Sequence, residues 1–221
     1  MNHFINLKDV PAKDLQKIVA DAKKRKNLRK KLSTLEVDKG APLKGKLLIQ
    51  MFEKSSLRTR LSFYLAIKQL GGGTLTLRSN ELHLGQGGES IADTAKILST
   101  YGDGFMLRTD SDEKVENFRD HLTIPVINGL SPSSHPTQVL SDVFTVEEIK
   151  KKKISKLNRL TEAQPYSRRR DPNPRCRGGV RPPSTFSRVA EVACDPFDAA
   201  NITVIKVQDA ITVQKCCFGI T

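Results

Sequence analysis

The fold is decided by residues 47–70, LLIQMFEKSSLRTRLSFYLAIKQL. Their first six residues form an apolar run typical of a buried strand, and the last ten have the amphipathic spacing of a helix. Between the two lie Ser56 and Thr59, which carry hydroxyl donors, and Arg58, whose planar guanidinium suits phosphate. A helix N-terminus attracts oxyanions through its free N–H groups and its dipole. The stretch therefore indicates an anion site, with an ordinary capped helix and solvated arginines as the alternative.

The alternation of strand and helix continues on both sides of this stretch. Helical patterns occupy residues 11–35, 56–70, 89–100, 113–119 and 136–149, and strand patterns occupy residues 46–52, 74–77, 104–109 and 124–130. This alternation predicts an α/β fold with a four-stranded parallel sheet and helices on both faces. Ligands of parallel sheets bind beyond the C-terminal ends of the strands. Because Ser56, Arg108 and His135 each follow or end a strand, we expect them to converge on one edge of the sheet.

Four segments, in order, resemble the motifs of the carbamoyltransferases, the family of ornithine and aspartate transcarbamylases. The anion site resembles the family's Ser-Thr-Arg-Thr-Arg signature, and residues 88–94 resemble its Gly-Glu-Ser-Ile-Ala-Asp-Thr segment. Residues 105–109 resemble a strand that ends in a substrate-binding arginine. Residues 126–130 and 135–138 resemble a further strand and the His-Pro-x-Gln motif that follows it. The resemblance implies a carbamoyl phosphate-binding domain.

By this resemblance, the phosphate of carbamoyl phosphate is held by Ser56, Leu57, Arg58 and Thr59. Leu57 stands where the family usually has threonine, so its backbone N–H remains available while a hydroxyl donor is lost. A lost hydrogen bond to a charged group costs roughly 1.5–3 kcal/mol. We therefore expect weaker phosphate binding than in family members that carry the threonine.

The resemblance also implies how the carbonyl end is bound. Arg108 would bridge the phosphate and carbonyl oxygens, His135 would donate to the carbamoyl oxygen, and Gln138 would bind the carbamoyl amine. Thr59, Arg108 and His135 are the expected catalytic residues, since together they would stabilise the oxyanion of a tetrahedral intermediate. His83 stands where ornithine enzymes usually place a glutamine that contacts the carbamoyl phosphate of a neighbouring subunit, and the resemblance implies a homotrimer for an intact protein.

The implied reaction transfers a carbamoyl group from carbamoyl phosphate to ornithine and gives citrulline and phosphate. No metal or organic cofactor is implied, because positioning and electrostatic stabilisation carry the chemistry. By the same resemblance, residues 3–7, 106–109 and 128–130 favour ornithine as the acceptor, whereas Thr137 favours aspartate. An aspartate carbamoyltransferase-like protein is therefore an alternative.

The composition changes near Asn158. Residues 1–150 hold 23 basic and 18 acidic side chains, a net charge of +5, whereas residues 151–221 hold 14 and 6, a net charge of +8. All four cysteines and six of the eleven prolines also lie after residue 150. We expect a carbamoyl phosphate-binding domain at 1–158 and an unrelated tail at 159–221 that is disordered or derived from a frameshift.

Two motifs of the family's amine-binding domain, Asp-x-x-x-Ser-Met-Gly and His-Cys-Leu-Pro, do not occur in the sequence. The chain is therefore expected to be inactive or impaired as a transferase. The alternative is a non-catalytic remnant that binds carbamoyl phosphate or phosphate.

Composition also bears on location and partners. No apolar run approaches the roughly 20 residues of a membrane span, and the first residues lack the apolar core of a signal peptide, so we expect a cytoplasmic protein without a membrane partner. The cysteines lack the spacing of zinc ligands, so we expect no metal site. Only Tyr166 lies near the basic cluster at 151–170, and we therefore do not expect nucleic acid as a partner.

Overall fold

The computed structural model describes residues 3–78 and 89–150. The helices of this part are η1 (Leu7–Asp9), α1 (Ala12–Leu28), η2 (Arg29–Lys31), α2 (Leu57–Gln69), α3 (Ile91–Tyr101), α4 (Asp112–His121) and α5 (Pro136–Lys150). The strands are β1 (Leu47–Phe52), β2 (Gly73–Arg78), β3 (Gly104–Arg108) and β4 (Val126–Leu130). The expected order of strands and helices is confirmed.

The helix expected over residues 11–35 is too long. In the structure α1 ends at Leu28, one 3-10 turn follows, and Leu32 is extended. The cause lies in Arg29, whose guanidinium donates to the backbone oxygens of Ser33 (2.8 Å) and Glu36 (2.9 Å) and also pairs with Asp38. These contacts turn the chain back over the end of α1, an interaction that helical periodicity does not reveal.

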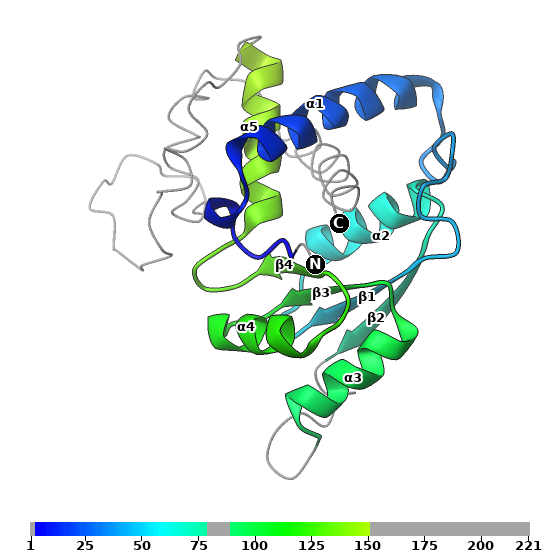
Figure 1. Cartoon of the computed structure of the whole chain (residues 1–221). Coiled ribbons are helices and arrows are strands. Elements are labelled where there is room, and N and C mark those ends of the chain that lie inside the picture. Colours follow the sequence, from blue (N-terminus) through cyan, green and yellow to red (C-terminus); the bar gives the residue numbers. More distant parts are fainter. Residues whose placement is uncertain (1–2, 79–88, 151–221) are drawn as a thin grey trace, which may run out of the picture.

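The four strands form one parallel sheet in the order β2-β1-β3-β4 (Figure 1). Phe4 extends the sheet beside β4 through an isolated parallel bridge to Ile127. In that bridge the Phe4 N–H donates to the Val126 oxygen (2.8 Å) and the Asn128 N–H donates to the Phe4 oxygen (2.9 Å). The N-terminal segment thus lies against the strand that leads to the His135 loop.

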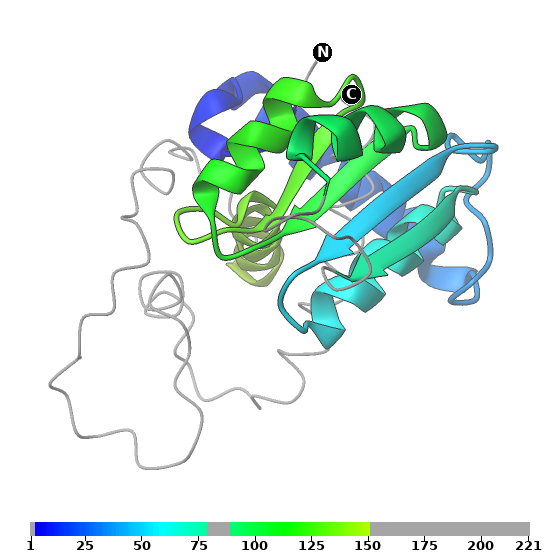
Figure 2. The ribbon, with the colours of Figure 1, turned by 90° about the horizontal axis from the view of Figure 1, so that it is seen from below.

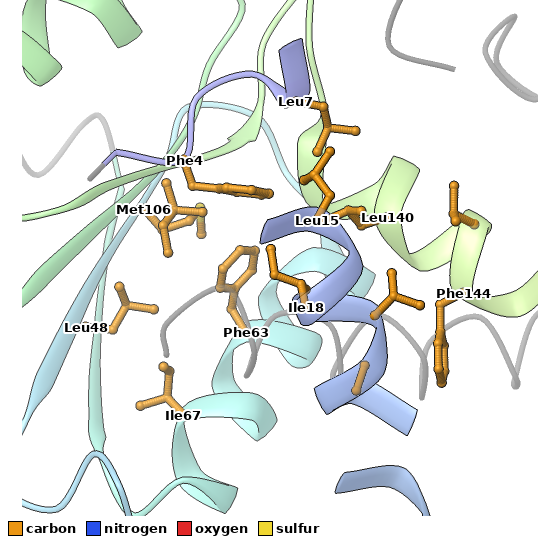
Figure 3. Close-up of a cluster of buried hydrophobic side chains, with 14 of the residues drawn as sticks. Phe4, Leu7, Leu15, Ile18, Leu48, Phe63, Ile67, Met106, Leu140 and Phe144 are labelled. Atoms are coloured by element: carbon orange, nitrogen blue, oxygen red, sulfur yellow. The ribbon is translucent and has the colours of Figure 1, made fainter. Parts of the chain in front are cut away.

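Helices cover both faces of the sheet, as the sequence predicts. Helices α1, α2 and α5 lie on one face and α3 and α4 on the other (Figures 1 and 2). Alternate residues of β1 serve the two faces, because successive side chains of a strand point in opposite directions. Leu48 joins the core under α1, α2 and α5 (Figure 3), and so does Phe52, whereas Ile49 and Met51 join the core under α3 and α4.

A bulge interrupts the pairing of β3 with β4 at the end that carries the candidate site. Leu107 pairs with Asn128, but the next residue, Arg108, pairs with Leu130, which leaves Gly129 as an extra residue. A Cβ atom at position 129 would collide with the sulfur of Met106, so only glycine fits. The bulge brings the turn that follows β4 beside Arg108.

Within the described ranges, 3–78 and 89–150, none of the helices combines the length and the apolar character that a bilayer crossing requires.

Candidate functional site

The candidate site lies at the C-terminal edge of the sheet. Three segments meet there: the N-terminus of α2 after β1, the end of β3, and the N-terminus of α5 after β4. Parallel strands carry their loops to a common edge, which is why residues separated by almost 80 positions come together. The expected convergence of these three segments is confirmed by the topology.

The first turn of α2 has the geometry of an anion cradle. Ser56 is the N-cap, with extended backbone, and its hydroxyl accepts from the Thr59 N–H (3.4 Å). The first N–H groups of a helix have no intrahelical partner, so those of Leu57 and Arg58 are available to a ligand. The Leu57 side chain is 74% exposed and offers only carbon atoms at this position.

Arg108 connects β3 to this cradle. Its Nη1 donates to the Thr59 hydroxyl (3.0 Å), across 49 residues of sequence. Its Nε atom is buried and lacks a hydrogen-bond partner in the described part of the chain. Thr59 is itself buried, so the pair is held between the helix and the sheet.

His135 opens α5 on the opposite side of the cradle. Its backbone oxygen accepts from the N–H groups of Gln138 (3.1 Å) and Val139 (3.2 Å), and Pro136 takes the first helical position, where its missing N–H is harmless. The ring Nδ1 lies 3.4 Å from the Thr137 hydroxyl. Helix α5 therefore fixes the backbone of His135 and leaves its ring at the edge of the sheet.

Among the described residues, no ion pair joins Arg58 or Arg108 to a carboxylate within 4 Å. Burial, and after it the charge of Arg58, lowers the pKa of Arg108. Burial, and after it the charge of Arg108, lowers the pKa of His135 to about 3. Arg58 and Arg108 thus repel each other, with the neutral imidazole of His135 within the influence of Arg108, and a bound oxyanion would relieve the repulsion between the cations.

Gln138 is brought to this edge but is already engaged. Its amide nitrogen donates to Asp142 one turn along α5 (3.0 Å). A role on a carbamoyl amine would need the Gln138 amide oxygen, since that amine donates and the amide oxygen is the acceptor of the side chain. Arg60 points elsewhere, with its guanidinium 5.6 Å from the centre of the Phe52 ring. The expected contact of His83 lies outside the described residues.

Sequence reasoning did not assign roles to the groups that support Arg108. Glu53 accepts from the Thr109 hydroxyl and from Lys114 Nζ (2.5 Å), while its N–H donates to the Arg108 oxygen (2.9 Å). The Thr109 hydroxyl also accepts from the Ser111 N–H (3.2 Å). These bonds tie the end of β1 to the turn after β3. The sequence feature that could have indicated these supporting groups is the polar residue directly after each strand.

Taken together, the parallel sheet and the cationic cradle at its strand ends define an α/β anion-binding domain. A family model described as "Aspartate/ornithine carbamoyltransferase, carbamoyl-P binding domain" matches residues 2–148. The chain belongs to the aspartate/ornithine carbamoyltransferase family. Members of this family are enzymes, and the resemblance expected from the four motifs is confirmed.

Individual relatives agree with the family match. Ornithine carbamoyltransferase of Brucella ovis is 46% identical over 148 residues, which cover 67% of this chain and 46% of the relative. The structure of ornithine carbamoyltransferase from Pyrococcus furiosus is similar with a TM-score of 0.61 and 39% identity, over 68% of this chain and 46% of that one. The catalytic subunit of M. jannaschii aspartate transcarbamoylase is similar with a TM-score of 0.60 and 33% identity, over 69% and 48%. The chain therefore spans about half the length of the relatives it matches.

Proposed function

We propose that this chain binds carbamoyl phosphate at the edge formed by α2, β3 and α5. Ser56, Leu57, Arg58 and Thr59 hold the phosphate, in part through the N–H groups of the first helical turn. Arg108 lies between the phosphate and the carbonyl oxygen. The observation that carries the proposal is the 3.0 Å bond from Arg108 to Thr59, which joins the helix cradle to the sheet, together with the charge of a second arginine, Arg58, that acts on Arg108.

His135 and Gln138 bind the carbonyl end of the ligand. A neutral imidazole at neutral pH, as the lowered pKa of His135 supports, can donate one N–H to the carbamoyl oxygen. Thr59, Arg108 and His135 then stabilise negative charge on that oxygen as an amine attacks the carbonyl carbon. Gln138 accepts from the carbamoyl amine through its amide oxygen, while Asp142 holds its nitrogen. His83 of a neighbouring subunit would complete the pocket in a homotrimer.

We propose ornithine as the acceptor that the family reaction would use with this domain. The named relatives with 46% identity are ornithine carbamoyltransferases, whereas the aspartate transcarbamoylase structure is 33% identical. Transfer to ornithine yields citrulline and phosphate without a cofactor. Aspartate as acceptor is the alternative, and Thr137 favours it.

Calorimetric titration with carbamoyl phosphate tests the binding proposal. The full chain should bind it saturably, and Arg108→Gln should weaken binding at least tenfold, because a charge-assisted contact is lost. Lys68→Gln is the matched control, since it removes one positive charge at the far end of α2. Absence of saturable binding to the unaltered chain, or equal affinities for Arg108→Gln and Lys68→Gln, would reject the proposal.

A second candidate function is carbamoyl phosphate binding without turnover. The match to the family ends at residue 148, and the amine-binding motifs named above do not occur among the 221 residues. We therefore expect weak or no transferase activity from this chain when it is assayed alone. Citrulline formation with ornithine, and carbamoyl-aspartate formation with aspartate, distinguish the two candidates once binding has been measured.

A further inference from the structure

The turn between β4 and His135 is held by one buried side chain. Asn128 is 1% exposed and sits in β4, two residues before the strand ends. Its Oδ1 accepts from the Leu130 N–H (3.0 Å), which fixes the residue after the bulge. Its Nδ2 lies within hydrogen-bond distance of three acceptors: Ser131 Oγ (2.9 Å), the Ile5 oxygen (3.2 Å) and the Ser134 oxygen (3.4 Å).

These contacts act on the peptide that precedes His135. The Ser134 oxygen, which faces the Asn128 amide, also accepts from the Ser131 N–H (2.9 Å) and so closes the four-residue turn. Because Ser134 is bonded directly to His135, a shift of this carbonyl moves the backbone of His135. On the other side, the Leu130 oxygen accepts from the Thr109 N–H (3.0 Å), next to Arg108. Asn128 thus sits between the two segments that carry the arginine and the histidine.

Hydrogen bonds hold the same turn where it borders a cavity. A polar cavity of about 300 Å³ lies beneath it, between the N-terminal segment and α4, and Asn128, Ser131, Ser133 and Ser134 line it. The far end of the turn is fixed by Asp112, which accepts from the Ser133 N–H (3.3 Å) and hydroxyl (2.8 Å). Beside a cavity, a turn keeps its conformation through hydrogen bonds rather than through close packing.

We propose that Asn128 is a positioning residue of the candidate site, which sets the placement of His135 relative to Arg108 through the turn at 131–134. The inference rests on the proposed function. It adds that recognition of the carbonyl end depends on the Asn128 amide, whereas recognition of the phosphate end depends on the α2 cradle. A defect at Asn128 should therefore alter the preference for carbamoyl phosphate over inorganic phosphate.

Asn128→Asp tests this dependence with little change in volume. The substitution replaces the donor NH2 group by an oxygen that faces the Ile5 and Ser134 carbonyls. We expect the affinity for carbamoyl phosphate to fall roughly tenfold, the effect of one lost buried hydrogen bond, while the affinity for inorganic phosphate changes less than about threefold. Asn117→Asp on α4 is the matched control for the added charge and should leave both affinities at the wild-type values.

Ser131→Ala provides a milder variant that keeps Asn128 and removes one of its acceptors. It should lower the preference for carbamoyl phosphate over inorganic phosphate by about twofold to fivefold, as expected for the loss of one neutral hydrogen bond. This variant provides the test if Asn128→Asp does not fold. If Asn128→Asp folds and prefers carbamoyl phosphate over inorganic phosphate as strongly as the wild type, the positioning role is overturned. If Asn128→Asp does not fold, a wild-type preference in Ser131→Ala overturns it. Failure of the unaltered chain to bind carbamoyl phosphate would instead overturn the proposed function.

Discussion

Leu57 departs from the signature at the residue where a ligand would meet the helix. It occupies the first position of α2 and exposes 74% of its side chain, so threonine can replace it without disturbing the core. We predict that Leu57→Thr tightens carbamoyl phosphate binding at least tenfold, since a hydrogen bond to a charged group contributes about 1.5–3 kcal/mol. Titration of both proteins measures the change. Leu61→Thr, one turn further along, is the control, and a gain below twofold at Leu57 would contradict the prediction.

Gln50 is a polar residue in the middle of the core. It is fully buried in β1, and neither its amide oxygen nor its nitrogen has a hydrogen-bond partner among the described residues. Gln50→Met keeps the length of the side chain and removes both polar atoms, so we predict a gain of about 1–3 kcal/mol in the free energy of unfolding. Urea denaturation measures it. Gln69→Met should instead lose stability, because the Gln69 amide donates to the Thr34 oxygen (2.7 Å).

The lowered pKa of His135 links stability to pH. The folded chain holds this imidazole neutral down to about pH 3, whereas the unfolded chain protonates it near 6.5. The unfolded state therefore binds more protons between these values, and this contribution to stability is complete above pH 6.5 and is lost as the pH falls toward 3. Between pH 6 and 5 the unaltered chain should lose roughly 1 kcal/mol more stability than His135→Gln. If the free energies of unfolding of the two proteins change equally with pH, the lowered pKa of His135 is contradicted.

Part of the site was predictable from sequence for a physical reason. Ser56, Arg108 and His135 stand at strand or helix ends, and the chain position of an element end fixes its place on a parallel sheet. The orientation of Gln138 was not predictable, because it depends on a side-chain contact with Asp142. The network of Asn128 was hidden for a similar reason, since its partners include the backbone oxygens of Ile5 and Ser134, which come from the N-terminal segment and from a turn.

At the scale of the element, helix α2 owes its sharp end to a glycine. Gly71 has φ +87°, and the N–H groups of Gly71 and Gly72 donate to the oxygens of Lys68 (3.0 Å) and Ile67 (2.9 Å), the pattern of a Schellman motif. An added Cβ at position 71 would also lie 2.9 Å from the Ala41 Cβ.

We predict that Gly71→Ala lowers the free energy of unfolding by at least about 1–2 kcal/mol, the cost of a left-handed conformation in a residue with a side chain. Gly73→Ala is the control, because an added Cβ there would meet Leu47 Cδ1 at 3.4 Å and the Lys46 oxygen at 3.8 Å, which are ordinary contact distances. Thermal or urea denaturation compares the two. Equal effects of both substitutions would show that the left-handed backbone does not matter.

Elements were predicted well where periodicity is local and poorly where distant groups intervene. The four strands and the helices between them follow from the alternation of apolar runs with amphipathic segments. The end of α1 does not, since the Arg29 contacts with Ser33 and Glu36 determine it. The bulge at Gly129 was equally hidden, because the close approach of the Met106 sulfur on the neighbouring strand is a contact between distant parts of the sequence.

At the scale of the molecule, the described residues form two hydrophobic cores. One core runs from Phe4 to Phe144 and the other lies between residues 5 and 126. We predict that a chain ending at Asn158 unfolds in one cooperative transition with a Tm within about 5 °C of the full chain, since a change of 1 kcal/mol shifts Tm by only about 2–8 °C. It should also bind carbamoyl phosphate with unchanged affinity. Loss of cooperativity on shortening would show that residues 159–221 belong to the folded unit.

The bridge between Phe4 and Ile127 also constrains when this domain can be completed during synthesis. Phe4 is made early, yet its hydrogen-bond partners in β4 are made more than 120 residues later. At roughly 5–20 residues per second, the interval is about 6–25 s. Throughout that time the N-terminal segment and the apolar face of α1 lack the strand and the helix that cover them, so a nascent chain offers chaperones a long window at its first amphipathic helix.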